Sequence, residues 1–290
     1  MAILKKGPAL SGKVGGLKYS QKDGVTVVSE LPGFFHDAKT RKQLVQRIKL
    51  NNILLTYRRL KDGLKENFEE VSGTRRACHV FRGANLVLSN HAWIPSRGVD
   101  DTGVLAPMVV SSGTLQPIGY SYENEMYYSD LNVGGLTISD RTRVCDLANA
   151  IVRNNAGWEY GDDLQVIVGE QSLRNSDSPE EFDSHLTDLK FHVFRIPMDR
   201  GCDDTLDKTI KDQLWKKALN PLAVSDGMLC FSPIIAESSY AQTYYAGALV
   251  HTRKNKSGLR ASRQQLLLTD STLFDHYSSP EMLAAQLGEE

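Results

Sequence analysis

Residues 244–268 read YYAGALVHTRKNKSGLRASRQQLLL, and they set the fold class. The aromatic and aliphatic run from Tyr244 to His251 predicts one strand, and the segment from Leu259 to Leu268 predicts a second. The residues between them, Arg253 to Gly258, are polar or charged and end in glycine, which is typical of a hairpin loop. The sequence therefore predicts two antiparallel strands in this part of the chain.

Short apolar or aromatic segments separated by turn residues precede this pair. They predict strands at residues 107–111, 116–122, 125–128, 164–168, 189–196 and 228–231. Helical spacing of apolar residues predicts helices at about 140–154 and 203–219, and Ser279 with Pro280 predicts the start of a short terminal helix. A β-sandwich is the arrangement that best buries so many short strands, so we expect a mostly antiparallel, sandwich-like body with inserted helices.

The N-terminal part has a different pattern. A hairpin is predicted where residues 17–20 and 25–28 flank Asp23-Gly24. A long helix is predicted from Thr40 to about Glu70, and a second from about residue 74 to 91. We therefore predict an α+β protein, with a basic hairpin and two-helix region at residues 1–95 and a strand-rich domain at residues 96–290.

Charge is distributed unevenly along the 290 residues, although 34 Lys and Arg nearly balance 35 Asp and Glu. Residues 1–65 hold fourteen basic and four acidic residues, a surplus of +10, which leaves −11 for the remainder of a chain whose net charge is −1. Such polarity favours a polyanionic partner or the acidic surface of another copy, while the ordinary alternative is two solvated faces. The candidate contact residues are Lys39, Arg41, Lys42, Arg47, Lys49, Arg58 and Arg59.

Motifs that carry chemistry are missing from the sequence. The glycine-rich residues 11–16 lack the spacing of a phosphate-binding loop, and neither G-x-S-x-G nor H-E-x-x-H occurs. Cys78 and His79 are neighbours, which on a helix directs them about 100° apart. The acidic residues 203–207 fit a first helical turn better than a metal site, because no second acidic cluster accompanies them. We therefore predict no catalytic residue, metal, cofactor or small-molecule substrate.

The chain contains no signal-peptide pattern and no run of about eighteen apolar residues. Its four cysteines are far apart in the sequence, which favours reduced thiols. These features predict a protein that is cytoplasmic or part of an assembled particle, with no membrane partner.

The motif Ser11-Gly-Lys-Val-Gly-Gly16, the hairpin ending in Ser29-Glu-Leu-Pro32 and the helix start at Gln43–Arg47 resemble an uncharacterised family of bacterial proteins, found mainly in Bacteroidetes. That family commonly begins with S-G-K-[IV]-G, a hairpin and a Gln/Arg-containing helix. The resemblance extends more loosely over most of the chain. It implies a bacterial origin and no signal peptide, and it implies no activity or cofactor. This chain has Glu30-Leu31 where a basic residue often precedes the proline.

Two functions remain in consideration, with an enzyme ranked third. The first is a non-catalytic structural or assembly protein that contacts itself or other subunits, as in a phage-like or other large bacterial particle. The alternative is a nucleic-acid-associated protein that binds phosphates through the basic helix at residues 39–65. Nucleic-acid-binding helices usually also present base-reading Asn or Gln or stacking aromatic residues, and here Asn51 and Asn52 lie between apolar stretches.

Overall fold

The computed structural model describes residues 2–4, 11–22, 25–31, 40–69, 71, 76–86, 103–174, 185–186, 189–212, 222–234, 242–256, 258–270 and 280–287. The chain divides into two compact units, Met1–Thr40 and Arg41–Glu290. Among the helices in these ranges, none is both long and apolar enough to cross a membrane.

The N-terminal unit is a four-stranded antiparallel sheet. Its strands are β1 (Ala2–Leu4), β2 (Gly12–Val14), β3 (Leu17–Lys22) and β4 (Val25–Glu30), in the order β1-β4-β3-β2. The predicted hairpin is confirmed by β3 and β4, which pair from Leu17 opposite Glu30 to Lys22 opposite Val25. Its turn, Asp23-Gly24, lies outside the described residues.

The second unit contains a large sheet, a smaller sheet and several helices. The large sheet has the order β10 (Lys190–Pro197), β8 (Asp162–Arg174), β13 (Gln242–Asn255), β14 (Gly258–Ala261), with β9 (His185–Leu186) on β8 and β16 (Leu267–Leu268) on β13. The smaller has the order β11 (Leu222–Ser225), β12 (Met228–Phe231), β7 (Met126–Asn132), β6 (Tyr120–Glu123), while β5 (Val109–Ser111) pairs with β15 (Gln264–Gln265). The helices are α1 (Arg41–Leu60), α2 (Ala77–Asn85), α3 (Val144–Asn154), α4 (Leu206–Asp212) and α5 (Pro280–Leu287). Helices and antiparallel strands together confirm the predicted α+β class.

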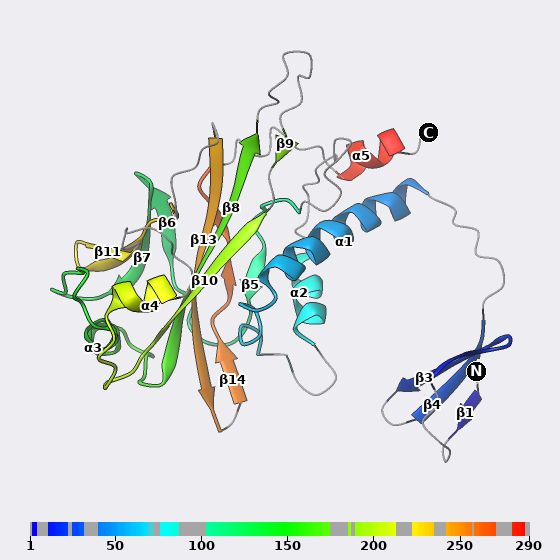
Figure 1. Ribbon diagram of the computed structural model, residues 1–290, viewed down its shortest axis with the longest axis horizontal. Coiled ribbons are helices and arrows are strands. Elements are labelled where there is room, and N and C mark those ends of the chain that lie inside the picture. The colour runs from blue at the N-terminus through cyan, green and yellow to red at the C-terminus, as the bar shows by residue number, and fades with distance from the viewer. Residues whose placement is uncertain are drawn as a thin grey trace. The chain divides into compact units, whose positions relative to one another are not determined.

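The large sheet has a buried layer on each of its faces. Alternation along β8 directs Val166 and Val168 to one side, into a core completed by the smaller sheet, α3 and α4. Ile167 points to the other side, where it joins a core that includes α1 and α2. Figure 1 shows the smaller sheet and the α1–α2 pair on opposite sides of β8, β10 and β13. A strand buried on both faces must be apolar throughout, which explains the sequence Val166-Ile-Val168.

The predicted boundary at residue 95 differs from the structure, in which the compact units divide after Thr40. The two helices belong to the body because Ile53 and Leu60 of α1 and Phe81 of α2 are fully buried in one core with the large sheet. Helix α1 ends at Leu60 rather than near residue 70. Leu64 continues the helical spacing of apolar residues, yet it lies in a turn and its side chain is buried in the core.

Buried carboxamide side chains act as backbone substitutes at two places. The segment from Gly103 to Leu105 is held by Asn52 of α1, whose Oδ1 accepts from Val104 N at 2.8 Å. From β8, Gln171 accepts from Leu105 N at 2.9 Å and donates to Gly103 O at 2.8 Å. In the same way Asn85 accepts from Val109 N at 2.7 Å and donates to Val109 O at 2.9 Å. These bonds satisfy backbone groups that have no strand partner there.

The smaller sheet approaches the large one closely at a glycine. Tyr127 and Phe231 stack with ring centroids 4.6 Å apart and planes at 13°. A Cβ on Gly247 of β13 would lie only 2.7 Å from a ring carbon of Tyr127 and 2.9 Å from Phe231. Tyr127 also donates from its hydroxyl to Leu267 O at 2.7 Å. The absence of a side chain at residue 247 therefore makes room for the aromatic pair.

Candidate functional site

The basic residues predicted as contacts lie mainly on one helix. Helix α1 holds six Arg and Lys and no acidic residue. Arg41, Lys42, Arg47, Arg58 and Arg59 are exposed and Lys49 is half-buried, whereas Lys39 lies outside the described residues. Arg41 donates to the carbonyl of Glu281 in α5 at 3.3 Å. Most of the predicted residues that can be placed are thus exposed to solvent.

The two asparagines of this helix have different surroundings. Asn51 is exposed, whereas Asn52 is 6 % exposed and is occupied by the backbone of Val104. Asn52 is therefore a structural residue, and a nucleic acid bound along α1 would find phosphate contacts rather than a pair of base-reading amides.

The two faces of the N-terminal sheet differ in charge, although Glu30 lies opposite Leu17 on the more apolar face and Val25 and Val27 lie on the face that carries the lysines. Val14 lies opposite Leu17 and Tyr19 opposite Val28, and residues opposite one another share a face. Lys13 lies opposite Lys18 on the other face. The sequence contains this signal, because Val14, Leu17 and Tyr19 alternate with charged or small residues.

Much of this sheet is exposed where its burial is described. Thr26 is the one buried residue within 11–21, 25–31 and 40. Val14 is 70 % exposed and Leu17 is 39 % exposed, although both are large and apolar. Large apolar side chains exposed in this way on a sheet are typical of a surface that contacts another layer or a partner.

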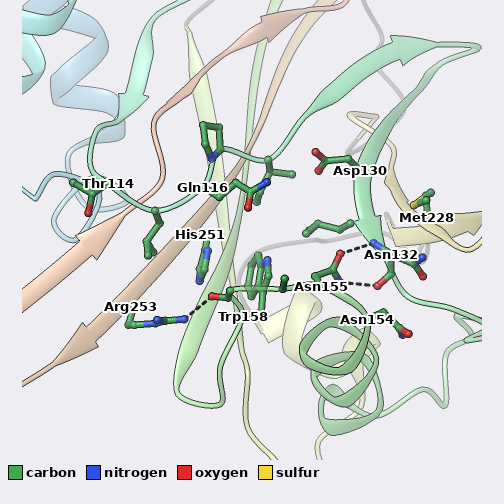
Figure 2. Close-up of a pocket in the computed structure, with 16 residues that line it drawn as sticks. Thr114, Gln116, Asp130, Asn132, Asn154, Asn155, Trp158, Met228, His251 and Arg253 are labelled. Carbon is green, nitrogen blue, oxygen red and sulfur yellow. Dashed lines mark hydrogen bonds between the residues drawn. The ribbon is translucent and has the colours of Figure 1, made fainter.

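A pocket of about 500 Å³ lies in the second unit, and sequence reasoning did not identify it. Its lining comes from the loop before β6, from β7, from the end of α3 and the turn after it, and from β12 and β13. Figure 2 shows His251 and Trp158 side by side, with Gln116 and Asp130 above them and Arg253 beside the turn. These residues span more than a hundred positions, so no local motif connects them.

A buried carboxylate organises the floor of this pocket. Asp162 is 1 % exposed and its Oδ2 lies 2.7 Å from Nε2 of His251. Arg253 donates to both oxygens of Asp162, at 2.6 and 2.8 Å, and also to Gly157 O at 2.7 Å and Glu159 Oε1 at 3.0 Å. The backbone N–H of Glu159 donates to Asp162 at 2.9 Å. This network ties the turn after α3 to β13.

Electrostatics keep this carboxylate ionised. Burial raises the pKa of Asp162, but the hydrogen bonds from Arg253 and His251 outweigh burial and hold its pKa at about 2. The same contact with Asp162 raises the pKa of Arg253. With Asp162 ionised, Nε2 of His251 carries the proton that Asp162 accepts. In the neutral ring Nδ1 is then an acceptor.

Several polar groups of the pocket are not used by the protein. His251 is 3 % exposed, and its Nδ1 has no hydrogen-bond partner among the described residues. The carboxylate of Asp130 and the amide of Gln116 are exposed and likewise take no partner from the described part of the chain. In contrast, Asn155 donates to and accepts from the backbone of Asn132, at 2.7 and 2.9 Å, so its amide is structural.

Comparison of the chain with models of protein families, with curated proteins and with solved structures finds no match, and the function is therefore inferred from its own residues.

Proposed function

We propose that this protein is a non-catalytic assembly protein whose N-terminal sheet pairs with the N-terminal sheet of a second copy. One observation carries the proposal, namely that Val14 and Leu17, two large apolar residues paired across β2 and β3, are both exposed. They share one face of the sheet and are 70 % and 39 % exposed. A sheet of this size is marginal alone, because it buries too little apolar surface to offset the entropy of ordering.

A second copy is the occupant that fits this face best. On this face Val14, Leu17, Tyr19 and Val28 are uncharged and Glu30 lies at its end, opposite Leu17, while Lys13 and Lys18 lie on the opposite face. Two copies related by a twofold axis could therefore stack their apolar faces without bringing these lysines together. Face-to-face stacking would supply each sheet with the second layer of a sandwich.

Charge supports growth beyond a pair. Residues 1–65 carry a surplus of +10 and the remainder carries −11. The basic face of the sheet and helix α1 are therefore suited to the acidic surfaces of neighbouring copies, which would build a phage-like or other large bacterial particle. Contacts of this kind weaken as salt rises, whereas the apolar pairing does not.

The mass of the full chain in solution tests the proposal. Light scattering coupled to size exclusion should give a multiple of 32.2 kDa for the unaltered protein. At high salt, where the charge contacts are screened, Val14→Asp should reduce the mass to that of the monomer, since it places a charge within the proposed apolar contact. Lys13→Asp is the matched control, because it introduces the same residue on the same strand but on the opposite face, and it should leave the pairing intact.

Two results would contradict the pairing. One is a monomer at every protein concentration and at both low and high salt, which would indicate that the apolar face is covered within its own chain. The other is an unchanged oligomer in Val14→Asp at high salt. Circular dichroism and thermal unfolding of both variants would establish that the body, residues 41–290, remains folded.

The second candidate is binding of nucleic acid along α1. It is favoured by six basic residues on a helix without an acidic residue, of which Lys42 and Arg58 have no ion-pair partner among the described residues. Phosphate contacts would give affinity that falls steeply with salt and does not depend on base sequence.

Fluorescence anisotropy with mixed-sequence DNA tests this candidate. Replacement of Lys42 and Arg58 by Gln should weaken binding and reduce the dependence of affinity on salt. Replacement of Arg200, in the loop after β10, and Arg260, in β14, is the control, because both are exposed basic residues outside α1. Affinity that does not fall as salt rises would exclude an electrostatic interface on α1.

A further inference from the structure

We propose that the pocket above Asp162 binds a neutral, polyhydroxylated ligand, the chemistry of a saccharide. The pocket is about 500 Å³, within the range of sites for small molecules. It lies in the body and shares no residue with the N-terminal sheet, so it stands independently of the assembly proposed above.

The first support is an imidazole in the pocket lining that is held in place and has one ring nitrogen unused by the described residues. His251 is fixed through Nε2 by Asp162 at 2.7 Å and through its ring face by Trp158, whose centroid is 3.8 Å away. No described residue bonds to Nδ1, and when the ring is neutral this nitrogen is an acceptor. A ligand hydroxyl is a donor that suits it.

The second support is the charge balance of the lining. Arg253 is the cation of the lining, and its guanidinium is already committed to Asp162, Glu159 and Gly157. Asp130 is the carboxylate of the lining, and it has no partner among the described residues. A phosphate or carboxylate ligand would therefore meet an unpaired negative charge and no free positive charge. Donors such as hydroxyl groups suit Asp130 and His251 together.

The third support is the mixture of amide and apolar groups. Gln116 offers a donor and an acceptor that no described residue uses, and it lies on the same side of the pocket as Asp130 (Figure 2). Leu115, Ile118 and Leu131 supply apolar wall between these polar groups. A saccharide alternates hydroxyl groups with C–H surface, and so it matches a lining of this kind better than a purely apolar or a charged ligand does.

Saturation-transfer NMR and calorimetry on the full chain test the proposal. The probes are glucose, galactose, mannose, N-acetylglucosamine, maltose and lactose, with glucose 6-phosphate and putrescine as charged comparisons. At least one neutral sugar should bind, and Asp130→Ala and Gln116→Ala should each weaken it about tenfold, because each removes hydrogen bonds made in the pocket. Asp140→Ala is the matched control, since Asp140 is exposed and is not part of the lining, and it should leave the affinity unchanged.

Each other result would overturn the proposal. Absence of transfer to every neutral sugar at millimolar concentration would do so, as would sugar binding that Asp130→Ala and Gln116→Ala leave unchanged. Tighter binding of glucose 6-phosphate than of glucose would contradict the charge balance. Binding of putrescine alone would make the pocket a site for organic cations. Asp130 and Gln116 are exposed, so both variants should unfold with the temperature dependence of the unaltered protein.

Discussion

The imidazole of His251 lies flat on the indole of Trp158, with ring centroids 3.8 Å apart and planes at 8°. The edge of the same imidazole is held by Asp162 at 2.7 Å. Trp158 follows α3, Asp162 begins β8 and His251 belongs to β13, so one ring joins three segments of the body. Stability and the shape of the pocket therefore depend on the same contacts.

Acid should destabilise the protein through Asp162. Its pKa is about 2 in the folded protein against an ordinary value of 3.8, so the unfolded chain takes up the proton first. The stabilisation is therefore fully present above the ordinary value and is lost as pH falls toward about 2. Urea unfolding at a series of acidic pH values should show this loss.

Asp162→Asn should remove that part of the pH dependence and cost about 3 kcal/mol at neutral pH, because it takes from Arg253 its buried ionic partner and leaves only the exposed Glu159 among the described residues. Asp140→Asn, on the surface, should preserve both the stability and its dependence on pH. A pH profile of Asp162→Asn identical to that of the unaltered protein would remove Asp162 as its cause.

Two glycine-to-alanine changes should have opposite signs. At Gly247 the new methyl group would lie 2.7 Å from Tyr127, so Gly247→Ala should destabilise by about 2–3 kcal/mol. At Gly83, in α2, a Cβ has no heavy atom within 4 Å, and Gly83→Ala should stabilise by about 0.5–1 kcal/mol because alanine is the better helix former. Thermal unfolding measures both, and equal effects would show that the close approach at Gly247 does not matter.

Asn85→Asp should destabilise at neutral pH and recover in acid. Asn85 is fully buried and donates to Val109 O and Phe81 O, both at 2.9 Å. An ionised aspartate would face these carbonyl oxygens with no proton to donate, at a cost of about 3 kcal/mol. Protonation restores a donor, so the new carboxyl should have a raised pKa and the variant should gain stability as pH falls below it.

The control for this change is Asn154→Asp, at an exposed position. Unfolding in urea at neutral and mildly acidic pH should separate the two variants. If Asn85→Asp were as stable as Asn154→Asp at neutral pH, the pairing of Asn85 with Val109 would contribute nothing.

Tyr127→Phe should cost about 1–2 kcal/mol. The change keeps the stack on Phe231 but removes the 2.7 Å hydrogen bond to Leu267 O. Tyr128→Phe is the neighbouring control, because no described residue bonds to the hydroxyl of that half-buried tyrosine. Chemical unfolding compares the two, and equal losses would mean that the bond from Tyr127 is not stabilising.

Helices and strands whose apolar residues recur at a regular spacing could be predicted from the sequence. Val144, Leu147 and Ile151 recur at helical intervals, and α3 covers Val144–Asn154 within the predicted range. The C-terminal hairpin was also predicted, and β13 pairs with β14 from Thr252 opposite Ala261 to Asn255 opposite Gly258. Periodicity suffices here, because one buried face determines the conformation of each segment.

Features that depend on contacts between distant parts of the chain could not be predicted from the sequence. Leu64 continues the apolar spacing of α1, but it lies in a turn after the helix and is fully buried there. The spacing alone therefore did not show where the helix ends. Strand β11 (Leu222–Ser225) was not predicted, because its four residues carry too little pattern. The pocket joins Gln116, Trp158 and His251, which only the fold brings together. The basic residues of α1 could be named from the sequence as candidate contacts, but their exposure to solvent could not be predicted.

The hydrogen bonds from Asn52 and Gln171 to the segment from Gly103 to Leu105 have a consequence for how the body unfolds. One clamp belongs to a helix and the other to the large sheet, so the segment is released only when both layers separate. The amide protons of Val104 and Leu105 should accordingly exchange with deuterated water at the rate of global unfolding, among the slowest in the chain. Three consecutive residues without secondary structure of their own would thus report on the cooperativity of the whole body.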